Sequence, residues 1–142
     1  MRYSFTCYGH ENITAKHKTT LEFTKDTGIG LEGDCIVGVR ADFQLNKIKQ
    51  FIKNMSNNKI TIIIKPTLNN NKNKINKKIT EKINAEINPG FNSDKEMVIR
   101  KTDFVSERTF AIMADKAACE LDKDLIRNIA NNKQKISVLF YY

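Results

Sequence analysis

The sequence predicts an α+β fold that is rich in strands, internally duplicated, and built as a partly closed β-barrel-like domain with two helices. Three observations lead to this prediction: short runs that alternate polar and apolar residues, two stretches with helical spacing, and one order of elements that occurs in both halves. The chain has 142 residues, of which 40% are hydrophobic, so it is long enough to bury one core. We therefore expect a single domain over residues 1–142.

In the first half, extended elements are predicted at residues 3–13 and, from alternating residues, at 19–24. Short apolar runs predict buried strands at residues 35–39 and 60–64. Between the last two, apolar residues recur every three or four positions, which is typical of an amphipathic helix. The apolar face of this predicted helix consists of Leu45, Ile48, Phe51, Ile52 and Met55.

The second half repeats the order. Strands are predicted at residues 82–87, 96–100, 109–113 and 136–140, with a turn at 88–90 after the first of them. A helix is predicted before the last strand, and its apolar positions are Ala118, Leu121, Leu125, Ile126 and Ile129.

Particular residues recur together with this order. Residues 39–42 (VRAD) match residues 112–115 (IMAD), and residues 51–59 match residues 125–133, each ending in Asn-Asn-Lys. A duplicated sheet commonly closes on itself because closure removes exposed edges, which is why we predict a barrel-like arrangement. The predicted pseudo-repeats cover about 3–66 and 84–142.

Two alternatives stay open at this point. The sheet can instead be an open α+β sandwich, and the internal matches can be chance similarity in a chain rich in Asn, Lys and Ile. The duplication makes the more specific prediction, because it requires strand, helix and strand to occur twice with the same connectivity.

The formal net charge of +8 is concentrated in one segment. Residues 67–83 are rich in Asn and Lys and have no counterpart in the other half, so we expect a loop. One interpretation is a solvated loop whose composition has drifted, and the other is a basic tract that contacts phosphates. We expect folding to depend little on this segment, because polar chain offers little surface to bury.

Cysteine usage and hydropathy predict a cytoplasmic location. The three cysteines Cys7, Cys35 and Cys119 have no CxxC spacing, which favours reduced thiols. The longest apolar run is far shorter than the roughly 20 residues that a membrane helix needs, and the N-terminal residues do not resemble a signal peptide. We therefore expect no membrane partner.

Two blocks of sequence resemble a known family. The first block is residues 9–25 (GHENITAKHKTTLEFTK) followed by residues 33–39 (GDCIVGV), and the second is residues 97–109 followed by residues 114–118 (ADKAA). Both are similar to an archaeal family known as domain of unknown function 371. The resemblance covers most of the chain outside the Asn/Lys-rich loop, and it implies a prokaryotic cytoplasmic protein without implying an activity.

The densest polar cluster predicts a binding function. If the two halves face each other, cations from the second half line one cleft with polar groups of the first half. Such a cleft suits nucleic acid or a phosphorylated metabolite, because guanidinium groups bind phosphate and carboxylate in a bidentate manner. The alternative is an ordinary solvated surface with charges on strand exteriors. The predicted ligand-binding residues are Thr19, Glu22, Arg100, Lys101, Arg108 and Lys116.

A small enzyme is the second functional hypothesis. Its predicted acid and base groups are His17, Asp34 and Asp115, since imidazole titrates near neutral pH and strand ends commonly carry sites. His10 and His17 are weak candidates for metal ligands because their spacing matches no zinc motif. Asp42 and Asp115 follow strands and are equally suited to capping the helices. The sequence does not identify a cofactor or an oligomeric state.

Overall fold

A computed structural model describes residues 1–67 and 79–142, and it confirms the predicted order of strands and helices. The first half consists of β1 (Arg2–Tyr8), β2 (Thr20–Thr24), β3 (Ile36–Gly38), α1 (Leu45–Lys53) and β4 (Lys59–Pro66). The second half consists of β5 (Glu81–Ile87), β6 (Glu96–Arg100), β7 (Thr109–Ile112), the 3₁₀ turn η1 (Ala118–Glu120), α2 (Lys123–Ile129) and β8 (Lys135–Tyr141).

The second helix is shorter than its apolar spacing predicts. After η1 the chain is extended at Leu121, and α2 begins only after Asp122. The Asp122 carboxylate accepts hydrogen bonds from the backbone N–H groups of Asp124 and Leu125, which are otherwise unpaired at a helix start. This cap fixes where α2 begins and divides the predicted helix in two.

The strands form one mixed eight-stranded sheet in the order β1-β8-β4-β5-β7-β6-β2-β3. The pairs β2–β3 and β6–β7 are parallel, and the other neighbours are antiparallel. The first strand of the chain, β1, pairs along its whole length with the last strand, β8. Segments that are distant in sequence are therefore direct neighbours in the sheet.

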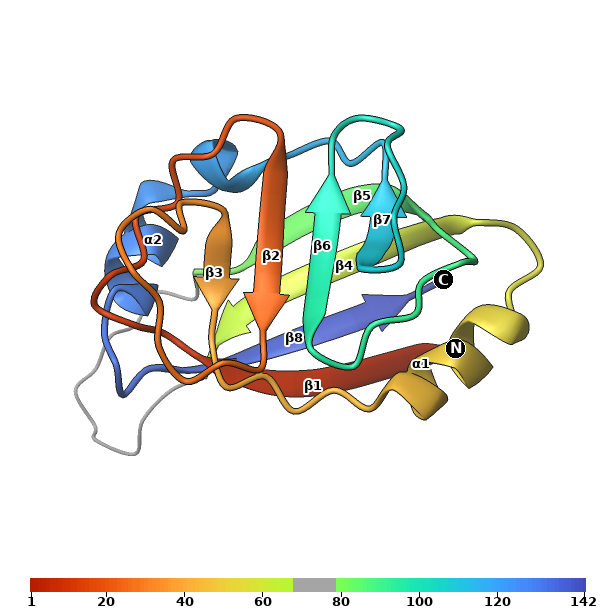
Figure 1. The fold of residues 1–142 in the computed structure, drawn as a ribbon, viewed down its shortest axis with the longest axis horizontal. Helices are drawn as coiled ribbons and strands as arrows, with labels where there is room; N and C mark the ends of the chain where they lie inside the picture. The colour runs from red at the N-terminus through yellow and green to blue at the C-terminus, as the bar shows by residue number, and fades with distance from the viewer. Residues whose placement is uncertain (68–78) are drawn as a thin grey trace.

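The sheet bends into two layers whose strands cross at a steep angle (Figure 1). We call β7, β6, β2 and β3 the front layer and β1, β8, β4 and β5 the back layer. The sheet is not closed into a barrel, which corrects the barrel-like prediction. At the bend, β5 and β7 share only two residue pairs, and at the other side a single antiparallel bridge joins Tyr8 to Val39.

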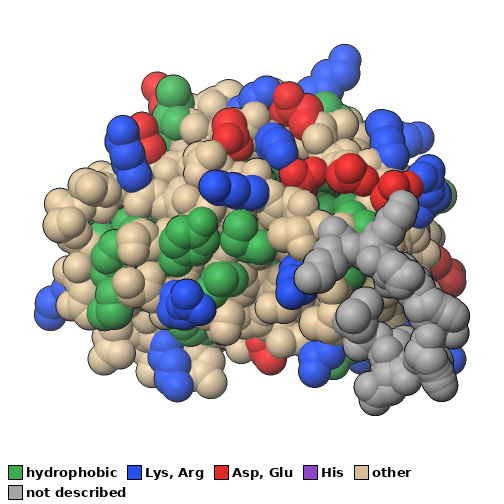
Figure 2. Space-filling view, turned by 180° about the vertical axis from the view of Figure 1, so that it is seen from behind, with side chains coloured by type: hydrophobic (Ala, Val, Ile, Leu, Met, Phe, Trp, Pro, Cys, Tyr) green, Lys and Arg blue, Asp and Glu red, His purple; other side chains and the backbone are tan. Residues whose placement is uncertain are grey.

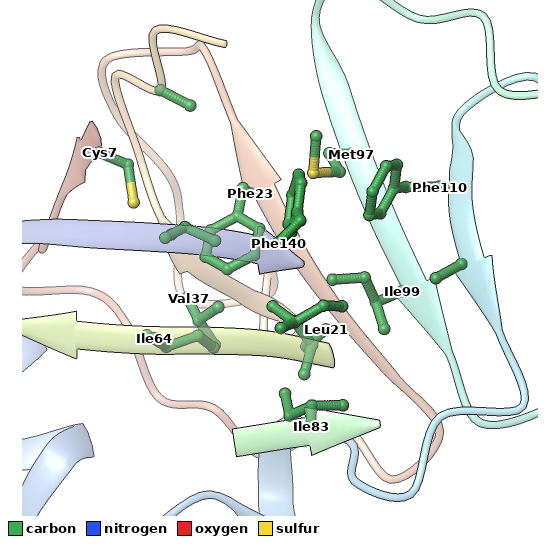
Figure 3. Packing of buried hydrophobic residues seen from close by; sticks show 14 of the residues in the cluster. Cys7, Leu21, Phe23, Val37, Ile64, Ile83, Met97, Ile99, Phe110 and Phe140 are labelled. Carbon is green, nitrogen blue, oxygen red and sulfur yellow. The ribbon is translucent and has the colours of Figure 1, made fainter. Parts of the chain in front are cut away.

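The core lies between the two layers (Figure 3). Leu21 and Phe23 of β2 point inward from the front layer, and Ile62 and Phe140 point inward from the back layer. The period of two in these strands places alternate residues on the same face, so the apolar set of each strand is buried together. The helices cover the two ends of this core rather than an outer face of the sheet (Figure 1).

The predicted loop at residues 67–83 is only partly covered by the structure. Residues 68–78 lie outside the described residues, whereas Glu81 and the two residues after it already belong to β5. None of the helices in the described residues is long and apolar enough to span a membrane.

Candidate functional site

Three of the predicted ligand-binding residues meet on the outer face of the front layer. Glu22 lies on β2, Arg100 lies at the end of β6, and Arg108 immediately precedes β7. Because β2 pairs with β6 and β6 pairs with β7, residues about 80 positions apart become neighbours. With the residues that contact them they form what we call the front cluster: Glu22, Cys35, Glu96, Arg100, Arg108 and Thr109.

Two carboxyl groups of the front cluster share one guanidinium group. Nη1 of Arg108 lies 2.5 Å from Oε2 of Glu96 and 4.0 Å from Oε1 of Glu22. The thiol of Cys35 donates a hydrogen bond to Glu22 Oε1 at 3.6 Å. The Glu22 side chain is only 8% exposed, whereas that of Glu96 is 35% exposed. Glu22 is therefore the member of the pair that has lost most of its contact with water.

Burial and, to a smaller extent, the neighbouring Glu96 raise the pKa of Glu22 from its ordinary value of 4.5 to about 7, against the opposing effect of Arg108. Burial and the adjacent Glu22 also raise the pKa of Cys35, to about 12. The Cys35 thiol thus stays protonated at neutral pH and is a poor nucleophile. The acid pair, not the thiol, is the group in this cluster that can exchange a proton near pH 7.

The raised pKa of Glu22 makes stability depend on pH. The folded state holds this proton up to about pH 7 and the unfolded chain only up to about 4.5, so stability falls as pH rises through that window. We expect the free energy of unfolding, measured by urea denaturation, to be about 1–2 kcal/mol lower at pH 8 than at pH 5.5.

Glu22→Gln should abolish this difference, because the amide keeps the shape of the side chain without its charge. Glu107→Gln, at an exposed carboxyl group, is the matched control and should keep the wild-type dependence. An unchanged pH dependence in Glu22→Gln would show that Glu22 is not the responsible group.

Arg100 is held apart from the acid pair by its own contacts. Its Nε donates to the Thr109 hydroxyl at 2.9 Å, and its guanidinium carbon lies 4.9 Å from the centre of the Phe104 ring. Thr109 is fully buried and also accepts from the backbone N–H of Ser106. These contacts fix the direction of the Arg100 side chain at the surface.

The remaining predicted ligand-binding residues lie elsewhere and are engaged in other contacts. Lys101 pairs with Glu120 at 2.9 Å, and Lys116 pairs with the buried Glu81. The hydroxyl of Thr19 contacts the hydroxyl of its neighbour Thr20. The structure thus gives no sign of the shared basic cleft that we predicted, because most of its cations are matched by carboxylates.

The two histidines stabilise local turns. Nδ1 of His10 accepts from the backbone N–H of Asn12 at 3.0 Å, and Nδ1 of His17 accepts from that of Thr19 at 3.2 Å. The backbone carbonyl of Asp34 accepts from the His17 N–H, which places these two residues side by side through their backbones. Residues 1–67 and 79–142 contain no group of three or more His, Cys, Asp and Glu side chains that could hold a metal ion.

Asp42 and Asp115 do not cap the helices. Oδ1 of Asp42 accepts from the backbone N–H of Thr6 in β1, and Oδ1 of Asp115 accepts from that of Asn84 in β5. In return, the backbone N–H of each aspartate donates to the carbonyl of the same partner. Each aspartate therefore ties the connection after β3 or β7 to a strand of the back layer.

A second surface, which the sequence reasoning missed, is the outer face of the back layer. Its outward positions carry the partly exposed apolar or aromatic residues Ile63, Leu139 and Tyr141. Figure 2 shows hydrophobic side chains on this face with Lys and Arg side chains beside them. Within residues 1–67 and 79–142, Glu86 is the single carboxylate at an outward position of these four strands. We call this surface the back face, and its cations are Arg2, Lys59, Lys65, Lys82 and Lys135.

A hollow of about 690 Å³ lies at one end of the back face. Met113 lines it with a side chain that is 52% exposed, and its backbone has a φ of 53°, which a side chain with a Cβ rarely adopts. Such conformations persist where the surrounding structure imposes them, often at functional sites. Other lining residues are Lys59, Thr61, Asn84, Glu86, Asp115 and Tyr141.

Comparison with known proteins places the chain in a family. The model of the family described as domain of unknown function 371 (DUF371) matches residues 5–142. The chain belongs to the DUF371 family. It is also 31% identical over 136 residues to the uncharacterized protein MJ0206 of Methanocaldococcus jannaschii, and the match covers 96% of each chain. The resemblance inferred from the sequence is confirmed.

In this DUF371 protein, the sequence pattern of β4 indicates part of the back face. Lys59 and Lys65 occupy the same side of β4 because they are six residues apart, and the buried Ile60, Ile62 and Ile64 lie between them on the other side. The positive charge was predicted to lie mainly in the loop, and the lysines of the strands were not assigned to a face. No sequence pattern indicates the hollow, since its lining residues come from four separate segments of the chain.

Proposed function

We propose that this DUF371 protein binds nucleic acid on the back face. The observation that carries the proposal is the charge at the outward positions of the four strands: five cations against one carboxylate, with no salt bridge from any of the five to a described residue. Cations without protein partners are available to replace counterions on phosphate groups. In the front cluster, Arg108 lacks this property because it is already bound to Glu96. The side chain of Arg100 is held by Thr109 and Phe104.

The spread of these cations favours a polyanion over a phosphorylated metabolite. Lys59 and Lys65 are six residues apart on one strand, which corresponds to about 20 Å. Lys82 and Lys135 extend the set to β5 and β8. One phosphate cannot reach cations separated by such a distance, whereas a chain of phosphates can. The apolar and aromatic residues between the cations give unpaired bases a surface on which to lie.

Neutralising the lysines of the back face tests the proposal. The variant Lys59→Gln/Lys65→Gln/Lys82→Gln/Lys135→Gln should bind a fluorescent single-stranded decamer at least about tenfold more weakly at low salt, measured by anisotropy. The slope of log K against log salt should also become shallower, because fewer counterions are released.

The matched control removes the same charge from other surfaces, with Lys16→Gln/Lys18→Gln/Lys95→Gln/Lys123→Gln. It should keep most of the affinity. Equal losses in the two variants would indicate an effect of net charge alone, and full affinity in the first variant would exclude the back face as the binding surface. Both variants retain residues 68–78, so the comparison is independent of that segment.

One observation favours the alternative, a small enzyme. Glu22 and Glu96 form a carboxyl pair in which one proton is exchangeable near pH 7, as acid–base catalysis requires. This chemistry belongs to the front cluster rather than to His17, Asp34 and Asp115. It ranks second because the pair is bound by Arg108 of the same chain.

We also infer that the two halves arose by duplication. Both halves have three strands, a helix and a strand in that order. The paired contacts Asp42–Thr6 and Asp115–Asn84 are equivalent, and Arg40 and Met113, two positions before these aspartates, both have a φ of 53°. When the first half is matched to the second in this way, the Tyr8–Val39 bridge between β1 and the residue after β3 corresponds to the pairing of β5 with β7. This correspondence supports an ancestral arrangement closer to a barrel.

The proposed setting is the cytoplasm. Cys7, Cys35 and Cys119 are free cysteines, as is usual for proteins of reducing compartments. Nucleic acid is available to a binding protein in that compartment.

A further inference from the structure

The hollow beside Tyr141 has the dimensions and the polarity of a site for one base. Thr61 lies opposite Tyr141 on one neighbouring strand and opposite Asn84 on the other, so the three residues form one row across β8, β4 and β5. Neighbouring strands are about 4.8 Å apart, which makes this row about 10 Å wide. The volume of about 690 Å³ leaves room for a base and its sugar.

The polar side chains of the row are fixed before any ligand arrives. The Thr61 hydroxyl donates to Asn84 Oδ1 at 3.0 Å, and Asn84 Nδ2 donates to Asp115 Oδ2 at 3.2 Å. Asp115 in turn accepts from the Asn84 backbone N–H. These hydrogen bonds fix the side chains at the floor of the hollow, and a preorganised site spends less free energy on ordering when it binds.

The charges around the hollow favour a nucleotide, with its phosphate at the rim, over a phosphate alone. Lys59 and Glu86 lie directly opposite each other on β4 and β5, and both point outward, yet they form no salt bridge. Two carboxylates, Glu86 and Asp115, line the hollow beside this one lysine. A phosphate inside the hollow would be repelled, whereas a phosphate at Lys59 with a base turned toward Glu86 would satisfy both side chains.

Apolar surface is available on the walls. Tyr141 points outward from β8, because the preceding residue, Phe140, points into the core. Met113 contributes a half-exposed thioether side chain from the connection after β7. Aromatic rings stack on every base, so this contact supports binding without selecting a sequence.

We propose that the hollow receives one base of a single strand, stacked on Tyr141, and that Glu86 selects bases with an exocyclic amino group, cytosine over uracil among the pyrimidines. The proposal rests on the proposed function of the back face. Its selective element is Glu86, because a carboxylate accepts the hydrogen bond that the N4 amino group of cytosine donates, and the O4 carbonyl of uracil offers no donor there.

The test compares RNA decamers of cytosine, of uracil and of abasic sites at pH 7.5 and constant salt. The wild-type protein should bind the cytosine decamer at least about fivefold more tightly than the uracil decamer. Glu86→Gln should bring this ratio close to one. Tyr141→Leu should weaken binding of both decamers by about fivefold or more, whereas Tyr141→Phe should retain it. The abasic decamer should bind the wild-type protein and Tyr141→Leu equally.

The possible failures are distinguishable. Equal affinity of the wild-type protein for the cytosine and uracil decamers would overturn the base site, and so would an unchanged ratio of these affinities in Glu86→Gln. The proposed function would still stand if the fourfold Lys→Gln variant of the back face bound more weakly. Failure of every decamer to bind would overturn both. Thermal melting of Glu86→Gln and Tyr141→Phe at the wild-type temperature establishes that the variants are folded.

Discussion

Phe140→Ala should lower the free energy of unfolding by about 3–5 kcal/mol, measured by urea denaturation. Phe140 is fully buried between the two layers of the sheet (Figure 3). Its ring centre lies 4.4 Å from that of Phe110 in β7, 5.7 Å from that of Phe5 in β1 and 6.4 Å from that of Phe51 in α1. Removing this ring would leave a cavity bordered by three different elements, and interiors packed to this density relax only partly around a void.

Phe104→Ala is the matched control for this variant. Phe104 is 60% exposed, and its main contact is the Arg100 guanidinium group above its ring. Its loss should cost no more than about 1 kcal/mol, the usual size of an exposed cation–π contact. Similar losses of unfolding free energy in Phe140→Ala and Phe104→Ala would contradict the central place of Phe140 in the core that the ring distances indicate.

Gly9→Ala should be destabilising by about 3 kcal/mol or more, because an added methyl group has no room. A Cβ at Gly9 would lie 2.2 Å from the carbonyl oxygen of Ile129 and 2.6 Å from that of Asn131, both backbone atoms. The Gly9 N–H donates to the Gln134 carbonyl at 2.8 Å, so the chain cannot move away without losing a hydrogen bond. The expected result is a large drop in melting temperature.

Gly28→Ala makes the same chemical change where space is available. The nearest atom to a Cβ at Gly28 is His10 Nε2 at 4.0 Å. This variant should melt within about 2 °C of the wild-type protein, since surface substitutions usually change stability little. Comparable melting temperatures for the two variants would contradict the close approach at Gly9.

Local patterns were sufficient to predict the order of the strands and helices, although not where α2 begins. The apolar run at residues 60–64 predicts β4, and the spacing of Ile48 and Phe51 predicts α1, because apolar residues mark the parts of an element that are buried. The closure of the sheet could not be predicted in this way. Whether β5 and β7 share two residue pairs or a full ladder depends on how the layers pack, and no local pattern records that.

The site was predictable only in part, for a similar reason. Glu22 and Arg108 were identified by their residue types, but their juxtaposition depends on the pairing of β2, β6 and β7. Lys101 and Lys116 were predicted as ligand-binding residues from their charge, and in the folded chain they pair with Glu120 and Glu81. Sequence alone shows a charge without showing its counterion. The back face was missed because its lysines are distributed over several strands.

The pairing of β1 with β8 has a consequence for the synthesis of the protein. Translation proceeds at about 5–20 residues per second, so β1 leaves the ribosome on the order of ten seconds before its partner strand has been made. During that interval Phe5 and Cys7 have no ladder to join, and a strand with unpaired backbone groups is prone to association with other chains. The back layer can therefore be completed only after β8 has been made, and burial of Phe5 and Cys7 waits for that strand.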